Sequence, residues 1–327
     1  MPAAHVRRVV IVGAGAIGGA VGARLFEAGT DVTLVARGAH ATVIAADGLT
    51  LVEPDREVVL PVPVVTSVAD AAIEGGTVVV LAVKTQDTPP VLAELAAVAS
   101  PDTPIACFQN GVANERLVGE VFPATYGVVV MMPAAHLEPG VVEAYASPIP
   151  GLFDIGLATG GIDATIEELV AVLAHAGFDT RAVPDVMRWK YTKLLMNLGN
   201  AVEAICVRDA DAAELVSRAR REARDVFEAA GIAYASKEEE AGRRGDLLQA
   251  REIRGSVRGG GSSWQSIARG LGSIEADALN GEVVRIAAAA GRAAPVNAVI
   301  LDRAVVAAAA RVAPNSILAG ELLAALG

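Results

Sequence analysis

Hydrophobic and polar positions divide the chain into two parts with different periodicities. In the first part, short runs rich in Val, Ile and Leu alternate with segments whose apolar residues recur at helical spacing. Runs that are apolar at every position are typical of strands buried on both faces. The expected strands are residues 9–12, 31–35, 77–83, 105–108, 126–132, 141–146, 153–157 and 179–183. Their alternation with helices predicts an α/β fold with a doubly wound, mostly parallel sheet.

The pattern changes at Pro184-Asp185, after which apolar residues recur only at helical spacing. Helices are expected over residues 186–206, 210–230, 237–253, 273–290 and 296–311. We therefore predict two domains, an α/β domain over residues 1–184 and an all-α domain over residues 185–327. A cleft between the helical domain and the carboxyl edge of the sheet is the expected ligand site.

Two local features interrupt this regular pattern. Two apolar runs at 49–52 and 58–62, separated by Glu53-Pro54-Asp55, predict a hairpin inserted on the sheet. Residues 254–263 are rich in glycine and predict a mobile loop before a serine-rich helix start.

A glycine motif follows the first strand and opens the first helix. Gly13 allows a tight turn, Gly15 lets the backbone approach a pyrophosphate, and Gly18 lets the helix pack closely on the strand. The helix start, including Ala16 and Ile17, offers N–H groups to the phosphates. A strand before and a helix after the motif are the context that a dinucleotide site requires.

The end of the second strand indicates which dinucleotide is bound. Sites for NAD usually have an acid there for the ribose 2′-hydroxyl, whereas this chain has Arg37 and no acid. An arginine suits a 2′-phosphate, so the predicted cofactor is NADP(H); a solvated surface arginine is the alternative. Lys84, Gln109 and Asn110 follow other strands and are expected on the same carboxyl rim.

Composition and charge mainly exclude other classes of protein. The 327 residues are 53% hydrophobic and carry a net charge of −11, which argues against a general nucleic-acid or anionic-membrane binder. The first strand begins too early for a signal peptide, no apolar run is long enough to span a membrane, and the two cysteines lack metal spacing. We expect a cytoplasmic protein without a metal site. The Ala- and Val-rich C-terminal helices suit either a core or a homodimer face.

One predicted helix combines polar and apolar positions unusually. Lys193, Asn197 and Asn200 share a face of the segment 186–206, between stripes of leucine and valine. Such groups are costly to bury unless they meet a ligand or one another, although a partly exposed polar face is the alternative. Lys190 lies near the same face, and spacing alone does not separate the two lysines.

Two further positions suit a carboxylate or hydroxyl ligand. Ser263 follows the glycine loop at a helix start, where a hydroxyl either binds an anion or only caps the helix. Glu275 begins the next helix, and from position alone it is better explained as an acid that stabilises the helix dipole.

Together these residues resemble the ketopantoate reductase family (2-dehydropantoate 2-reductase) over essentially the whole chain. The resemblance implies a Rossmann domain joined to a helical domain like that of 6-phosphogluconate dehydrogenase. It is carried by residues 13–18, Val83-Lys84-Thr85, Gln109-Asn110-Gly111, residues 189–197, Ser262-Ser263 and residues 275–281.

The resemblance also implies residue roles. Lys193, which precedes Leu-Leu-Met-Asn, matches the general acid of the family and is thereby preferred to Lys190. Asn110 matches an asparagine near the nicotinamide and the substrate, and Arg37 and Lys84 match residues that hold the cofactor. Ser263 and Glu275 match residues that hold the substrate carboxylate and hydroxyls, and the catalytic set is Lys193, Glu275 and Asn110. Asn197 and Asn200 complete the predicted substrate site.

The expected activity is NADPH-dependent reduction of a 2-oxo acid, with 2-dehydropantoate, a precursor of pantothenate and coenzyme A, as the first candidate. Two departures keep a different branched or aromatic 2-oxo acid open. Asn197 and Asn200 are three residues apart, where the family often has a spacing of four. Asparagines of the family are also missing at Cys206-Val207-Arg208-Asp209 and at Gly259-Gly260-Gly261. A non-catalytic NADP(H) sensor is the alternative of another class, but it would not require the polar set of the helical domain.

Overall fold

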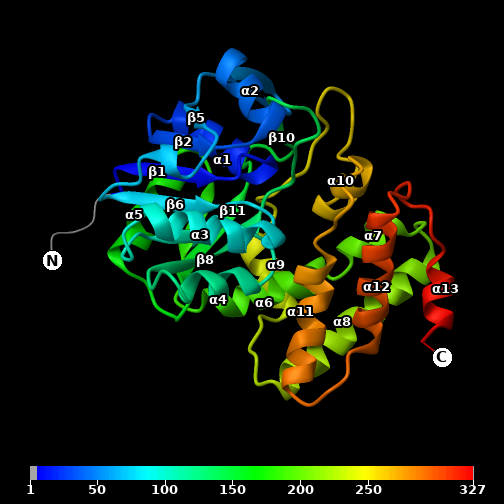
Figure 1. Ribbon diagram of the computed structural model, residues 1–327. Coiled ribbons are helices and arrows are strands. Elements are labelled where there is room, and N and C mark those ends of the chain that lie inside the picture. Colours follow the sequence, from blue (N-terminus) through cyan, green and yellow to red (C-terminus); the bar gives the residue numbers. More distant parts are fainter. Residues whose placement is uncertain (1–5, 327) are drawn as a thin grey trace. The chain divides into compact units, whose positions relative to one another are not determined.

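The computed structural model describes residues 6–326, which form two compact units (Figure 1). Unit 1 comprises the chain up to Gln109, Asn114–Met187 and Lys237–Arg258. Unit 2 comprises Asn110–Ala113, Arg188–Ser236 and the chain from Gly259 onward. The units interleave along the sequence, whereas the sequence predicted a single boundary between residues 184 and 185.

Unit 1 is built on an eight-stranded sheet with the order β12-β11-β8-β7-β6-β1-β2-β5. Every neighbouring pair is parallel except β8 and β11. The strands are β1 (Arg8–Val12), β2 (Asp31–Val35), β5 (Val64–Val65), β6 (Thr77–Leu81), β7 (Ile105–Cys107), β8 (Thr125–Met131), β11 (Leu152–Leu157) and β12 (Asp179–Ala182). The helices of this unit are α1 (Ala16–Glu27), α2 (Gly38–Asp47), α3 (Thr88–Val98), α4 (Ala113–Gly119), α5 (Ala164–His175) and α9 (Lys237–Arg244), with short 3-10 turns η1 (Ala69–Ala71) and η2 (Thr85–Asp87).

Side chains of β1 alternate between two apolar cores, one on each face of the sheet. Val9 and Ile11 belong to the core that includes α1 and α5. Val10 and Val12 belong to the core that includes α3 and α4. Helices therefore cover both faces, and the predicted doubly wound α/β sheet is confirmed.

A second sheet of four strands, in the order β4-β3-β10-β9, packs over α1. Its strands are β3 (Leu49–Glu53), β4 (Arg56–Leu60), β9 (Ala134–Ala135) and β10 (Val141–Ala144). The hairpin β3–β4 forms as predicted, but it belongs to this second sheet, because β3 pairs with β10. Glycines let α1 fit between the sheets: a Cβ at Gly19 would lie 2.7 Å from Val142, and one at Gly22 would lie 2.6 Å from Leu34.

Unit 2 is helical, as expected for the C-terminal part of the chain. Its helices are α6 (Val186–Asn197, whose first two residues belong to unit 1), α7 (Asn200–Ile205), α8 (Ala210–Ala229), α10 (Ser262–Ala268), α11 (Ala276–Ala289), α12 (Pro295–Ala309) and α13 (Ala319–Ala324). One apolar core joins residues of α7, α8, α10, α11, α12 and α13. Across residues 6–326, no helix combines the length and the hydropathy needed to cross a membrane.

Two helix predictions need correction. The helix expected over 186–206 is interrupted at Leu198-Gly199, so Asn200 starts α7 and does not share a helix with Lys193 and Asn197. The helix expected over 237–253 ends at Arg244. The segment 237–258 is held in unit 1 by Arg243, whose guanidinium pairs with Asp154 at 2.7 Å and Asp179 at 2.8 Å, and its apolar pattern does not reveal this.

Candidate functional site

The three glycines of the turn between β1 and α1 occupy different environments. Gly13 has φ +101°, and a Cβ there would lie 2.8 Å from the Val83 backbone nitrogen. A Cβ at Gly18 would collide with the Gly13 carbonyl oxygen. At Gly15 it would meet nothing within 4 Å. Gly13 and Gly18 are therefore required for packing, whereas Gly15 leaves its side of the turn open to a ligand.

The first turn of α1 completes this cradle. Gly15 is the N-cap, and no side chain caps the helix. Ala16 and Ile17 are partly exposed at its start. Since the first N–H groups of a helix have no partners within it, they are suited to bind phosphate oxygens. The turn and the helix start therefore fit the pyrophosphate of a dinucleotide.

Two cations follow the strands on either side of β1. Arg37 comes after β2, and its guanidinium pairs with Glu94 of α3 at 2.7 Å. This side chain is 59% exposed, so the ion pair is weak and easily exchanged for a phosphate. Lys84 comes after β6, is partly exposed and precedes η2. The strand order thus places both predicted cofactor residues beside the glycine turn.

A buried polar network, which the sequence analysis missed, fixes the ends of β6 and β7. The Gln109 amide donates to the Val83 carbonyl and to the Thr88 hydroxyl, both at 2.9 Å. The Thr88 hydroxyl donates to Asn114, whose amide donates to Thr85 at 3.0 Å. The network connects the segment that carries Lys84 to the starts of α3 and α4. Its only signal in the sequence is the presence of amides and hydroxyls directly after two apolar strands.

His40 of α2 is a second residue that the sequence analysis missed. The Gly140 N–H donates to His40 Nδ1 at 2.8 Å, so the neutral ring carries its proton on Nε2. Nε2 lies 2.7 Å from the carbonyl oxygen of Ala14, inside the glycine turn. The His136 ring packs against it with centroids 4.1 Å apart. His40 therefore supports the turn from behind, through a partner 100 residues away that no local pattern reveals.

Unit 2 contains the polar residues predicted to bind the substrate. Lys193 and Asn197 lie four residues apart on one face of α6. The Asn197 amide donates to Asn110 Oδ1 at 2.9 Å, so the structure brings these two predicted residues together. Lys190 is only 2% exposed, whereas Lys193 is partly exposed. Exposure therefore favours Lys193 as the lysine that reaches a ligand.

Asn200 lies near the start of α10, whose second residue is Ser263. A Cβ built on Gly261, the N-cap of α10, would lie 3.7 Å from Glu203 Oε2 and 3.9 Å from the Asn200 side-chain amide. Ser263 is completely buried, and its hydroxyl has no hydrogen-bond partner among the described residues. A buried hydroxyl without a partner is costly, which points to a ligand that supplies one.

Glu275 precedes α11 and is 8% exposed. It occupies the N-cap position, but its side chain accepts no capping hydrogen bond from the helix. Glu275 therefore does not cap the helix through a hydrogen bond, and its role at the substrate stays a prediction.

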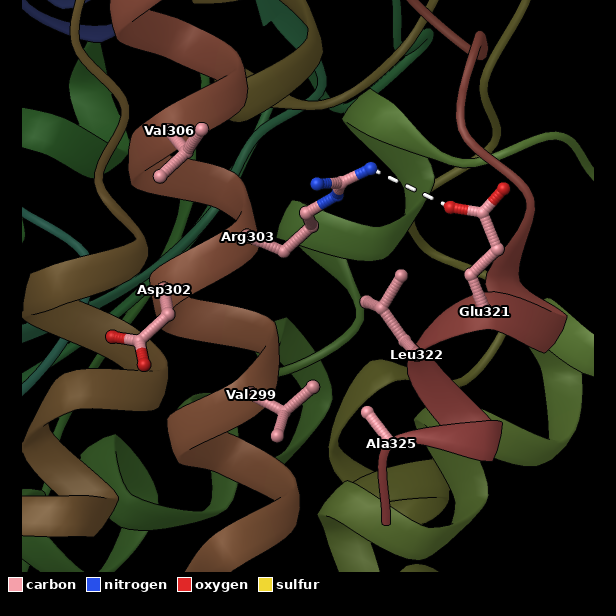
Figure 2. Close-up of a pocket in the computed structure, with 7 residues that line it drawn as sticks. All are labelled: Val299, Asp302, Arg303, Val306, Glu321, Leu322 and Ala325. Carbon is pink, nitrogen blue, oxygen red and sulfur yellow. Dashed lines mark ion pairs between the residues drawn. The ribbon is translucent and has the colours of Figure 1, made fainter.

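A separate pocket of about 400 Å³ lies between α12 and α13 (Figure 2). Its lining is apolar except for Asp302 and the ion pair of Arg303 with Glu321 at 3.5 Å. None of the predicted site residues lines it. The part of the chain that the structure describes also contains no cluster of His, Cys, Asp and Glu able to hold a metal ion.

Comparison with known proteins agrees with this arrangement. A 2-dehydropantoate 2-reductase from Pyrococcus horikoshii is 31% identical over 58% of this chain and 60% of its own length. The crystal structure of a PanE/ApbA family ketopantoate reductase from Ralstonia eutropha JMP134 is 26% identical, covers 93% of this chain and 99% of its own, and has a TM-score of 0.77. D-mandelate dehydrogenase, solved with NADH and anilino(oxo)acetate, shares the fold with a TM-score of 0.78 at 20% identity, over 93% of this chain and 99% of its own.

Family models give the most specific match. The model described as "Ketopantoate reductase PanE/ApbA" matches residues 9–158, which include the glycine turn, Arg37, Lys84 and Asn110. The model described as "Ketopantoate reductase PanE/ApbA C terminal" matches residues 185–306, which include Lys193, Ser263 and Glu275. Since the two models follow one another along the chain and together cover most of it, the chain belongs to the ketopantoate reductase family.

Proposed function

We propose that this protein reduces a 2-oxo acid to the 2-hydroxy acid with NADPH, and that 2-dehydropantoate is its substrate. The observation that carries the proposal is the buried Ser263 hydroxyl without a partner, in a chain that also has an open dinucleotide turn at Gly15. A protein that only binds NADP(H) needs the turn but has no use for such a hydroxyl in its helical unit. Family membership and the curated relative named 2-dehydropantoate 2-reductase support the choice of reaction.

In this proposal unit 1 binds the cofactor. The N–H groups at the start of α1 hold the pyrophosphate, Arg37 and Lys84 hold the adenosine side, and Arg37 selects the 2′-phosphate. When bound, NADPH supplies the hydride. The absence of an acid at the end of β2 supports NADPH over NADH.

Unit 2 binds and polarises the 2-oxo acid. Lys193 donates a proton to the oxygen that becomes the hydroxyl, which stabilises the charge that develops there. Ser263 donates to the substrate carboxylate, and Glu275 accepts from a substrate hydroxyl. Asn197 and Asn110, joined at 2.9 Å, and Asn200 orient the substrate.

A second substrate class is favoured by the loop before α10. A Cβ at Gly259 or Gly260 would lie within 2.6 Å of the Trp264 side chain, so neither position can carry a side chain while the indole packs there. Trp264 is further held by a 3.3 Å hydrogen bond to Asn315. The amide contacts expected of the family at this loop are thus absent, which suits another branched or aromatic 2-oxo acid.

The test is turnover of NADPH with a panel of 2-oxo acids: 2-dehydropantoate, 2-oxoisovalerate, which lacks the hydroxyl, and phenylglyoxylate. The proposal expects 2-dehydropantoate to have the highest kcat/KM. A higher value for an acid without the hydroxyl would move the assignment to the second substrate class. NADPH binding without turnover of any acid would contradict the proposal and favour the sensor.

The proposal also includes a cytoplasmic location and a homodimer. Cys107 and Cys206 are buried and form no disulfide, which suits the reducing cytoplasm. A homodimer stays a prediction, which sedimentation of the purified protein tests.

A further inference from the structure

The break between α6 and α7 separates two groups of predicted substrate residues. Lys193 and Asn197 lie on α6, and Asn200 is the first residue of α7. In an unbroken helix Asn200 would lie on the face of Lys193, seven residues away. With the break, Asn200 starts a separate helix, and its side chain lies near Gly261, the N-cap of α10.

Arg220 of α8 binds the end of α6. Its Nε donates to the Leu195 carbonyl at 3.1 Å and its Nη2 to the Met196 carbonyl at 2.8 Å. The last carbonyls of a helix lack partners within it and carry partial negative charge, so a guanidinium there stabilises the helix end. Arg220 forms no ion pair with any carboxylate of the described residues.

Gly199, inside the break, lies against α8. A Cβ at Gly199 would lie 3.1 Å from Val216 Cγ1, which is a tight contact, and 3.7 Å from Arg220 Nη2, which is an ordinary one. The break and the arginine are therefore close neighbours in the packing of α8.

Asn280 of α11 binds the backbone carbonyl of Leu198, inside the break. This residue is completely buried, and its amide donates to the Leu198 carbonyl at 3.2 Å and to Asn297 Oδ1 at 2.9 Å. The direction of these bonds is fixed by groups that can only accept. The Asn297 amide faces the Ala219 carbonyl at 3.1 Å and the Glu222 carboxylate at 2.8 Å, which leaves its oxygen to face Asn280.

We propose that Arg220 and Asn280 are positioning residues for the reaction. They hold α6 and α7 as two separate helices. Lys193 and Asn197 then lie on α6, while Asn200 lies on α7 near the start of α10, which carries Ser263. The inference rests on the proposed function and deepens it, because it assigns the geometry of the substrate site to two residues that donate hydrogen bonds to the backbone carbonyls of the break.

The experiment compares Arg220→Met and Asn280→Leu, which remove the donors, with the conservative Arg220→Lys. Steady-state kinetics with the best 2-oxo acid and a separate NADPH titration are measured for each. We expect the first two variants to lose about 10- to 100-fold in kcat/KM for the acid, as small misplacements do. The NADPH Kd should equal that of the wild type, and Arg220→Lys should recover part of the activity.

Arg218→Met is the matched control, because Arg218 also lies on α8 but pairs with Glu214 of the same helix, at 2.8 Å and partly exposed to solvent. It should leave kcat/KM unchanged. If Arg220→Met and Asn280→Leu lower Tm while kcat/KM stays at the wild-type value, the two residues are merely structural and the inference is wrong.

Hydrogen exchange of the amides of residues 198–203 gives a readout that does not need activity. Faster exchange in Arg220→Met and Asn280→Leu than in Arg218→Met is expected, and equal exchange in all three variants would overturn the inference. A wild-type protein that reduces no 2-oxo acid would contradict the proposed function alone, since the exchange result still decides whether these residues hold the break.

Discussion

At the scale of single residues, Arg37 decides between two cofactors that differ by one phosphate. Its present partner, Glu94, is 39% exposed, and the pair lies in water, where such contacts contribute little. A 2′-phosphate offers the guanidinium a charge-assisted contact with more acceptors than one carboxylate. Arg37 is therefore poised to exchange one anion for another when the cofactor binds.

Replacing Arg37 by alanine should raise the KM for NADPH and barely change that for NADH, because only the 2′-phosphate contact is lost. Glu94→Gln is the matched variant: it removes the competing anion and should bind NADPH at least as tightly as the wild type. Kinetics with both cofactors check this prediction. An equal rise in both KM values for Arg37→Ala would mean that Arg37 has some other role.

Glu275→Gln should cost more with a hydroxylated 2-oxo acid than with one that lacks the hydroxyl. A carboxylate that accepts a hydrogen bond from the substrate contributes about 1.5–3 kcal/mol, and only the hydroxylated acid can donate it. The test is the ratio of kcat/KM for 2-dehydropantoate to that for 2-oxoisovalerate, measured for the wild type and for Glu275→Gln. An unchanged ratio would remove Glu275 from the substrate site.

At the scale of elements, the turn between β1 and α1 contains one glycine needed for packing and another that is available for ligand binding. Gly13 has a positive φ and a crowded Cβ position, so its role lies in the fold. Gly15 has φ −70° and an open Cβ position, so any residue could occupy it without strain in the free protein. The two positions therefore predict opposite outcomes for the same substitution.

Gly13→Ala should destabilise the protein, since a strained φ costs about 1–3 kcal/mol and the clash with Val83 adds to it. Gly15→Ala should keep the wild-type Tm but weaken NADPH binding about tenfold or more, because the loss of one charge-assisted contact is enough for that. Thermal unfolding and an NADPH titration of both variants test the pair. Normal NADPH affinity in Gly15→Ala would argue against pyrophosphate binding at this turn.

Most elements could be predicted from the sequence because their signals are local. β1, β2 and α3 follow from apolar runs, glycines and an early proline, and the matching of Lys193 to the family follows from its neighbours. The break at Leu198-Gly199 was not predicted, because the apolar periodicity continues through it and a single glycine is only a weak signal. The residues that contact its carbonyls, Arg220 and Asn280, lie far away in the sequence. His40 and the Gln109 network were missed for the same reason.

At the scale of the whole molecule, the chain leaves and re-enters unit 1 through the segment 237–258. Arg243 is 7% exposed and pairs with Asp154, itself 4% exposed, and with Asp179. Burial alone would lower the pKa of Arg243, but the hydrogen bonds and charges of the two aspartates outweigh it and raise the pKa. The Arg243 guanidinium therefore keeps its charge although it is buried.

Arg243→Met should lower the free energy of unfolding by about 3–5 kcal/mol, because it leaves a buried carboxylate without its partner. Arg254→Met is the control in the same segment: it breaks a pair with Glu57 whose two side chains are about half exposed, and it should change stability little. Urea unfolding of both variants provides the comparison. If both variants lost equally little free energy of unfolding, the segment 237–258 would be held in unit 1 by contacts other than those of Arg243.

The central claim is that Lys193 protonates the substrate. The most direct test measures kcat and the NADPH Kd for Lys193→Ala and Lys190→Ala side by side. General-acid catalysis predicts a loss of about 10²–10⁴-fold in kcat for Lys193→Ala, with NADPH affinity unchanged and a much smaller effect of Lys190→Ala on kcat. An inactive Lys190→Ala beside an active Lys193→Ala would contradict the account, even with the fold and the family unchanged.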